Sequence, residues 1–260
     1  MAMKSESKRK GGFTLVELSI VMIIIGLLIG GILKGAELIE NSRLNTVIAT
    51  TKQITSAYNT FWDSYRGKPG DLAYARTMIP GCNDQSSCVN GNGNQKVGAE
   101  VGNPWSDIVS TIGSENTQFW KHLALADLIG GVNPSASEVG WGKTHIESPI
   151  AGGFQITTTR GSGGYASVAG LTILTRSRDD GQWLCGVATG NFEECSLSPN
   201  QAFRIDNKLD DGHAQSGKIA AISMSFRNGC GTPNTGINGP KGYNEGNSVK
   251  SCDMFFWLAP

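Results

Sequence analysis

Three carboxylates close together in the sequence are the residues best suited to bind a metal ion. Asp206, Asp210 and Asp211 lie within six positions, and a glycine follows them. Carboxylate oxygens are ligands that calcium prefers. Their spacing differs from that of an EF-hand, in which ligands alternate along a D-x-[DN]-x-[DN]-G loop. Two interpretations of the cluster stand: it binds calcium, or it forms a tight turn with solvated carboxylates. We expect the protein to require no cofactor.

Six cysteines are the other reactive side chains. Their even number favours disulfides. Two of the pairs enclose short polar loops, so among the possible connectivities the sequence favours sequential pairing as Cys82–Cys88, Cys185–Cys195 and Cys230–Cys252. Zinc is disfavoured because there is no C-x-x-C pair and the three histidines are scattered. The histidines also lack a nearby cysteine or serine motif, so we expect no catalytic residues and no enzyme activity.

A further unusual side chain is Glu17, the one charge in an apolar run. This run, residues 13–33, would span about 31 Å as a helix, close to the thickness of a bilayer core. Most of the charged residues before this run are basic. By the positive-inside rule, we therefore expect the N-terminus to stay in the cytoplasm and the rest of the chain to be exported. A carboxylate is costly in lipid and adds nothing to a simple anchor, so Glu17 needs a partner.

The residues around this carboxylate resemble a known processing signal. The sequence GGFTLVEL at residues 11–18 is similar to the cleavage site of type IV pilins and type II secretion pseudopilins. The resemblance implies that prepilin peptidase cuts after Gly12 and methylates the new amine of Phe13. It also implies that Glu17 pairs with the N-terminal amine of a neighbouring subunit in a filament. Removing one member of such a buried pair costs about 3–5 kcal/mol.

The resemblance implies a structural subunit of a type IV pilus or type II secretion filament. Its partners would be other pilin or pseudopilin subunits, the inner-membrane assembly platform and, before assembly, membrane lipid. It would begin as a single-pass protein of the bacterial inner membrane with a periplasmic head, and end in a periplasmic or extracellular filament. The alternative is a signal-anchored periplasmic binding or hydrolytic domain that does not polymerise. Within the family, the large head and the disulfides favour a minor or specialised subunit.

The chain departs from the family at one position of the apolar run. Many members have a proline near the twenty-second mature position, where this sequence has Lys34. Four glycines offer flexibility in its place, and they form two small-xxx-small pairs that suit close packing of membrane helices. They are Gly26, Gly30, Gly31 and Gly35. Glycine is also frequent in membrane helices in general, so the pairs have a second, neutral interpretation.

The elements that position these residues begin with one long helix. Apolar residues recur every three to four positions from Leu44 to Tyr65, so we expect the helix that starts at Phe13 to continue this far. Residues 65–71 (YRGKPGD) then resemble a Y-x-x-x-P-G-D motif that follows the long helix in many pilin-like proteins. Proline and glycine make it a turn, with Asp71 as a turn or capping residue.

Beyond this turn the sequence predicts a mixed head. Residues 81–104 predict a polar surface loop, and residues 116–129 predict a helix that ends at a Gly-Gly pair. Period-two alternation and short apolar runs predict strands, which are residues 154–160, 165–176, 183–188, 218–226 and 254–258. The predicted fold is therefore α+β and pilin-like, with a long N-terminal helix packed on an antiparallel β-sheet head whose loops are braced by disulfides.

The predicted organisation has four parts. These are a leader at residues 1–12, the membrane or filament-core half of the helix at 13–33, its amphipathic half at 34–66 and the globular head at 67–260. Removal of the leader leaves 18 basic and 21 acidic side chains, a net charge of −3. Because nothing in the sequence predicts a concentrated basic face, we predict no nucleic-acid partner.

Two features of the head have alternative interpretations. Four tryptophans lie in glycine-rich surroundings. They are Trp105, Trp120, Trp141 and Trp183. We expect them in the core, where large aromatic residues are usually found, and the alternative is an exposed patch that binds a carbohydrate or a partner subunit. The acidic cluster resembles a D-x-K-x-D-D-G stretch of related pilin-like chains. Since some pseudopilins bind calcium in their C-terminal loops, this resemblance is compatible with either a calcium site or a turn.

Overall fold

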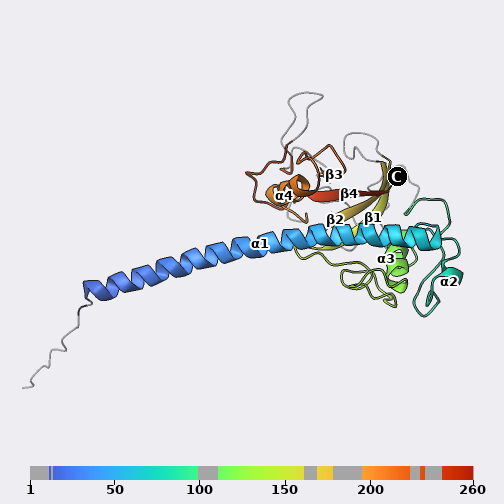
Figure 1. The fold of residues 1–260 in the computed structure, drawn as a ribbon, viewed down its shortest axis with the longest axis horizontal. Helices are drawn as coiled ribbons and strands as arrows, with labels where there is room; N and C mark the ends of the chain where they lie inside the picture. The colour runs from blue at the N-terminus through green and yellow to red at the C-terminus, as the bar shows by residue number, and fades with distance from the viewer. Residues whose placement is uncertain are drawn as a thin grey trace, which may run out of the picture. The chain divides into compact units, whose positions relative to one another are not determined.

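The structure is a computed structural model of the 260-residue chain. It describes residues 12, 14–98, 111–160, 169–177, 195–222, 229–231 and 242–259. Their elements follow the order α1, α2, α3, β1, β2, α4, β3 and β4 (Figure 1). The chain divides into two compact units, Met1–Ser42 and Arg43–Pro260. The boundaries of the four predicted parts stay predictions.

Helix α1 (Leu15–Tyr65) contributes to both units, as the predicted long helix requires. In the first unit its large hydrophobic side chains, from Leu15 to Ile39, are exposed. In the second unit the buried residues recur at three- and four-residue intervals, the pattern of a helix that packs one face on a core. They are Leu44, Val47, Thr51, Ile54, Ala57, Tyr58 and Phe61. The two parts of the helix therefore meet different environments.

The second unit, the head, contains a four-stranded antiparallel sheet in the order β1-β2-β4-β3. The strands are β1 (Gly153–Arg160), β2 (Ala169–Arg176), β3 (Ile219–Ile222) and β4 (Asp253–Ala259). The C-terminal strand β4 is central, because Phe256 lies opposite Ile173 of β2 and opposite Ile219 of β3. The α+β fold class with an antiparallel sheet is thus confirmed.

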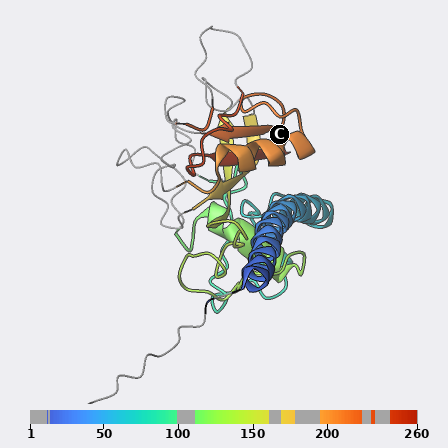
Figure 2. The same cartoon turned by 90° about the vertical axis from the view of Figure 1, so that its left-hand side faces the viewer.

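The core of the head joins the sheet, α3 (Glu115–Leu125) and residues 43–65 of α1 (Figures 1 and 2). Phe61 of α1, Trp120 of α3 and Phe154 of β1 are among its fully buried side chains. Burial of each such side chain stabilises the fold by about 1.5–3 kcal/mol. The core therefore fixes the second half of α1 against α3 and the sheet.

Helix α3 ends earlier than predicted. It stops at Leu125 because Asp127 adopts a left-handed conformation with φ of 59°. Leu128 N–H donates to the carbonyl of Leu123, and Asp127 N–H donates to that of Ala124. These two bonds form a Schellman cap, which usually has glycine at the left-handed position. The Gly-Gly pair that suggested a later end is therefore not the cap.

Helix α4 (Pro199–Leu209) and the single turn α2 (Ala75–Met78) were not among the elements predicted from the sequence. Ser198 begins α4 with a capping box: its hydroxyl accepts from Gln201 N–H, and the Gln201 side chain accepts from Ser198 N–H. Helix α4 contacts β3 beside the sheet (Figure 2). As a result Asp206 lies in the second half of a helix, so the interpretation of the acidic cluster as a tight turn does not hold for this residue.

The predicted strands agree with the structure where it describes them. Strands β1 and β4 match their predicted ranges within one residue at either end. The predicted strand 183–188 lies outside the described residues, as do the first residues of 165–176 and the last of 218–226. Residues 81–98 contain neither helix nor strand, as predicted for this part of the loop.

Candidate functional site

Helix α1 begins with a capping box formed by Thr14 and Glu17. The Thr14 hydroxyl accepts a hydrogen bond from Glu17 N–H (3.2 Å), and Thr14 N–H donates to Glu17 Oε2 (2.9 Å). The same hydroxyl also donates to Oε2 (3.0 Å). The T-x-x-E pattern of this box is visible in the sequence, although the partner predicted for Glu17 was in another subunit. Glu17 therefore has a local role in the single chain: it caps its own helix.

The residues next to this box belong to the predicted processing site. Gly12 is exposed, and Phe13 lies outside the described residues. Cleavage after Gly12, methylation of Phe13 and pairing of Glu17 with a neighbouring subunit therefore stay predictions. What the structure adds is that the helix begins at Leu15, within three residues of the predicted cleavage point.

Within the described residues, α1 is the helix that is long and apolar enough to cross a membrane. No residue in the most apolar 18-residue stretch of this helix is buried. A Cβ added at any of the four glycines in this part of α1 would meet no atom within 4 Å apart from the helix's own backbone. They are Gly26, Gly30, Gly31 and Gly35. Packing inside the chain therefore does not require glycine here, and a second helix could approach this surface closely.

Helix α1 continues through Lys34, the position where the family often has proline. The Lys34 ammonium lies 2.7 Å from the Glu37 carboxylate, one turn further along the exposed surface. Such a surface pair contributes at most about 1 kcal/mol. Backbone N–H at this position supports an unbroken helix, whereas proline would remove that donor.

The turn after α1 is built around the carboxylate of Asp71. Its Oδ1 accepts hydrogen bonds from the N–H groups of Gly93 (2.7 Å) and Asn94 (3.1 Å), and Oδ2 accepts one from Gln95 (2.6 Å). Burial raises the pKa of Asp71, and these three donors and the charge of Lys68 oppose that rise. Asp71 is thus more than the predicted turn residue, because it fixes a loop 22 to 24 residues later in the chain.

A second carboxylate holds the same loop from α3. Glu115 accepts hydrogen bonds from Asn92 N–H (3.1 Å) and Gly98 N–H (3.2 Å). Gly70 lets the turn approach α3 closely: its φ is 86°, and a Cβ there would lie 2.4 Å from the Glu115 carbonyl oxygen. The segment 91–98 is therefore held by two carboxylates through five backbone donors. No local sequence pattern predicts these contacts.

His122 is buried beside the Cys82–Cys88 disulfide, with a ring nitrogen within 4.8 Å of the sulfur atoms. Nδ1 accepts from Gly70 N–H (3.0 Å), so Nε2 carries the proton that bonds the Val89 carbonyl (3.1 Å). Burial lowers the pKa of His122 to about 4, which keeps the ring neutral near pH 7. Since both nitrogens are engaged and the sulfurs are bonded together, His122 is a packing residue.

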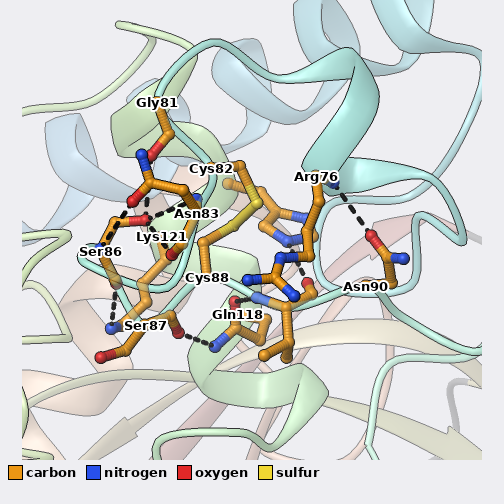
Figure 3. Close-up of a disulfide and its surroundings, with 12 residues drawn as sticks. Arg76, Gly81, Cys82, Asn83, Ser86, Ser87, Cys88, Asn90, Gln118 and Lys121 are labelled. Atoms are coloured by element: carbon orange, nitrogen blue, oxygen red, sulfur yellow. Dashed lines mark hydrogen bonds between the residues drawn. A yellow bond between two sulfur atoms is a disulfide. The ribbon is translucent and has the colours of Figure 1, made fainter.

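Neighbouring side chains of α3 hold the loop that this disulfide closes (Figure 3). Lys121 Nζ donates to the carbonyls of Ser86 (2.9 Å) and Ala136 (3.0 Å). Gln118 Nε2 donates to the Ser87 carbonyl (3.0 Å). Burial lowers the pKa of Lys121. The disulfide loop is therefore anchored to α3 by side chains as well as closed by its own bond.

Two of the three predicted disulfides are present in the structure. Cys82–Cys88 and Cys230–Cys252 have Cα separations of 5.0 and 5.1 Å. Cys195 is also disulfide-bonded. Its predicted partner, Cys185, lies outside the described residues, so the third pairing stays a prediction.

The acidic cluster comes together as the sequence suggested. Asp206, Asp210 and Asp211 each place a carboxylate oxygen within 4.8 Å of the other two. Asp206 is fully buried, so the interpretation of this cluster as wholly solvated is wrong. Burial raises the pKa of Asp206 to about 6, against the hydrogen bond that it accepts from Tyr243. Calcium binding at this cluster stays a prediction.

Each carboxylate of this cluster also accepts hydrogen bonds from its own surroundings. Asp206 accepts hydrogen bonds from the Tyr243 hydroxyl (2.7 Å) and Gly212 N–H (3.3 Å). Asp210 accepts them from Ile219 N–H (2.9 Å) and Lys218 N–H. Asp211 accepts them from His213 N–H (2.8 Å) and the Ser216 hydroxyl (2.6 Å). These bonds connect the end of α4 to β3 and to the C-terminal region. The cluster therefore has a structural role whether or not an ion binds.

Of the two described tryptophans among the four, one is a core residue and the other is half-buried. Trp120 is fully buried in α3, as predicted. Trp141 is half-buried, and its Nε1 donates to the Ser177 carbonyl (3.4 Å). Trp105 and Trp183 lie outside the described residues. Trp120 therefore cannot contribute to the exposed aromatic patch that was the alternative.

Comparison with known proteins identifies the N-terminal segment. Residues 7–33 match the family described as the prokaryotic N-terminal methylation motif, the hallmark of the prepilin-type signal of type IV pilins and pseudopilins. This motif implies processing by prepilin peptidase and assembly with other pilin subunits. Together with the apolar helix it fits a membrane-anchored protein. No curated protein and no solved structure matches the chain.

Proposed function

We propose that this chain, which carries the methylation motif at its N-terminus, is the precursor of a structural subunit of a type IV pilus or type II secretion filament. The observation that carries the proposal is the motif at residues 7–33, which extends into a helix with exposed apolar side chains. So large an apolar surface is covered by lipid or by other protein in the cell. Membrane lipid covers it before assembly and neighbouring subunits afterwards. Its role is structural and not enzymatic.

The proposed route has three steps. The chain enters the inner membrane with its N-terminus in the cytoplasm and its head in the periplasm. Prepilin peptidase then cuts between Gly12 and Phe13 and methylates the new amine. The assembly platform finally transfers the subunit into the filament, where Glu17 pairs with the amine of a neighbour. The cysteines of the head agree with this route, because disulfides form in the periplasm.

The capping box gives Glu17 two roles that variants can separate. In the single subunit, the hydrogen bonds from Thr14 compensate part of the cost of holding a carboxylate in lipid. Glu17→Gln keeps this box, since glutamine also serves at that position, but it removes the charge. Thr14→Ala weakens the box and keeps the charge. If assembly depends on the charge, only the first variant is defective.

The test measures three quantities for each variant: its amount in the membrane, its N-terminal processing and its incorporation into purified filaments. We expect Glu17→Gln and Glu17→Ala to be inserted and cleaved but incorporated at least about tenfold less, because they leave the partner amine uncompensated. Thr14→Ala should assemble nearly normally. Glu37→Gln is the matched control, since Glu37 lies on the same helix beyond the apolar run and pairs with Lys34. Normal incorporation of Glu17→Gln would remove this role of Glu17.

The competing function is a signal-anchored binding or hydrolytic domain that stays monomeric in the membrane. It would keep the leader, and none of the variants above would change its assembly. Within the proposed function, the large head and its disulfides favour a minor or specialised subunit. The molar ratio of this chain to the most abundant subunit in purified filaments distinguishes a minor from a major pilin.

A further inference from the structure

A hollow of about 260 Å³ opens in the head beside the turn that ends α1. Most of its wall comes from residues 65–74, among them Tyr65 and Asp71 at the two ends of the Y-x-x-x-P-G-D motif. Gly93 and Gln95, from the loop that Asp71 and Glu115 hold, complete the wall together with Met78. Part of the motif that the sequence predicts as a turn therefore also lines a pocket.

Aromatic and apolar side chains are exposed around this pocket. Outside α1, the exposed large hydrophobic side chains of the described residues are Tyr74, Met78 and Val249. Tyr74, which is 70% exposed, and Met78, which is 44% exposed, both line the pocket. Tyr65 adds a second, half-buried ring whose back packs on Phe61 with ring centroids 4.5 Å apart. The pocket therefore gathers two of the three exposed apolar side chains of the described head.

Polar groups of both hydrogen-bonding types line the same pocket. Arg66 and Lys68 carry donors, Asp71 carries acceptors and Gln95 carries both. The Asp71 carboxylate is buried at the pocket wall, and its Oδ2 accepts one N–H bond, from Gln95. A carboxylate oxygen has about two acceptor positions. Among the donors of the described residues, Gln95 alone bonds Oδ2, which leaves a position for a hydroxyl group of a ligand.

The pocket is held in shape before any ligand arrives. Three backbone N–H bonds to Asp71 and two to Glu115 fix the loop wall. In the turn, Arg66 of the pocket wall and the nearby Gly70 adopt positive φ of 52° and 86°, and a Cβ on Gly70 would lie 2.4 Å from the Glu115 carbonyl oxygen of α3. Preformed walls reduce the entropy that binding costs. Fixed walls of this kind are typical of a binding site.

We propose that this pocket binds one sugar residue of a glycan. A pyranose combines apolar C–H faces, which stack on tyrosine rings, with hydroxyl groups that donate and accept hydrogen bonds at once. A site for it therefore needs rings, donors and acceptors together, as found here. The volume lies just below the roughly 300–1,000 Å³ of pockets for drug-sized ligands, which suits a single ring. Tyr74 provides the stacking face and Asp71 Oδ2 a hydroxyl acceptor.

Such a site binds weakly by itself and gains strength by repetition. A single sugar ring buries little area, so we expect millimolar affinity for each head. A filament would present many copies of the head to one glycan chain, and avidity could then exceed the single-site affinity by about 10²–10⁴-fold. Binding to one head does not require assembly, so the proposal can fail or hold independently of the filament function.

The test uses the full chain extracted in a polyoxyethylene detergent, whose head group contains no sugar. Saturation-transfer difference NMR is recorded with the methyl glycosides of glucose, galactose, mannose, N-acetylglucosamine and galacturonate. We expect saturation of at least one glycoside by the wild-type chain. Tyr74→Ala should weaken its binding by about tenfold, while Tyr74→Phe, which keeps the ring, should bind nearly as well. Gln95→Ala tests the wall formed by the loop with a second exposed side chain.

Val249→Ala is the matched control, because Val249 is exposed to the same degree as Met78 but does not line the pocket. Circular dichroism confirms that each variant is folded. The proposal is overturned if wild type saturates none of the five glycosides, or if Tyr74→Ala binds like wild type. It is also overturned if Tyr74→Ala blocks filament incorporation without any glycoside binding in wild type, since the pocket would then hold a second copy of the chain.

Discussion

Glu17, Asp71 and Asp206 each accept hydrogen bonds that hold a different part of the chain: the start of α1, the loop at residues 93–95 and the contact of α4 with Tyr243. The sequence identified Glu17 and Asp206 as unusual from residue type and neighbours. It did not identify their partners. The partner of Asp206 is 37 residues away, and those of Asp71 are 22 to 24 residues away, so only the folded chain brings them together.

The substitution Asp71→Asn tests the role of this carboxylate in the loop. The asparagine side chain would turn an amide donor toward one of the three N–H groups, leaving that group without an acceptor. We expect the free energy of unfolding to fall by about 1–3 kcal/mol. Backbone amides at residues 93–95 should exchange with deuterium faster, while those of the sheet keep their protection. Asp84→Asn is the control, because Asp84 is exposed and pairs with Arg76 at the surface.

The raised pKa of Asp206 predicts that the folded protein loses stability as the pH rises. Because its pKa rises from 3.8 to about 6 on folding, the folded state favours the protonated form. Its contribution to stability is present below about pH 4 and is lost as the pH rises through 6. Since one pKa unit corresponds to about 1.4 kcal/mol, the loss amounts to at most about 3 kcal/mol. Asp206→Asn should remove this dependence.

The measurement is urea denaturation of wild type, Asp206→Asn and the exposed control Asp63→Asn between pH 4 and 7. Equal pH profiles for wild type and Asp206→Asn would contradict the assignment. The same variants test the calcium prediction. If an ion binds the cluster, calcium raises the unfolding temperature of wild type at pH 7 but not that of Asp206→Asn.

At the scale of elements, local patterns predicted α1, β1 and β4 well. A long apolar run, a stripe at helical spacing and period-two alternation each arise from neighbours in sequence. The errors have specific causes. Asp127 takes the left-handed position of a cap where glycine is usual, so the end of α3 could not be located. Helix α4 was hidden by its polar composition, although Ser198 and Gln201 form a readable capping box.

The capping box of α4 gives a prediction for the whole element. Ser198→Ala removes the acceptor of Gln201 N–H, and we expect a loss of about 1 kcal/mol in unfolding free energy. Ser198→Thr, which keeps a hydroxyl, should recover most of that loss. Denaturation midpoints with an unchanged slope measure both values. An alanine variant as stable as wild type would show that this box does not stabilise α4.

At the scale of the whole molecule, the two units pose different physical problems. The head, from Arg43 onward, buries its own core and closes two described disulfides. The first unit, up to Ser42, exposes a continuous apolar helix surface and so needs lipid or other subunits. The sequence predicted this contrast, because hydropathy and charge are local. What the head recognises could not be predicted, since the pocket forms only when the bonds to Asp71 bring residues 93–95 against the turn after α1.

The central claim is that the apolar helix belongs to a processed subunit and not to a permanent anchor. Mass spectrometry of the N-terminal peptide, from chain purified from its native membrane, tests this most directly. We predict a peptide that begins at Phe13 and carries a methyl group on its amine, with residues 1–12 absent. A chain that keeps the residues before Gly12, beginning at or near Met1, would contradict the account.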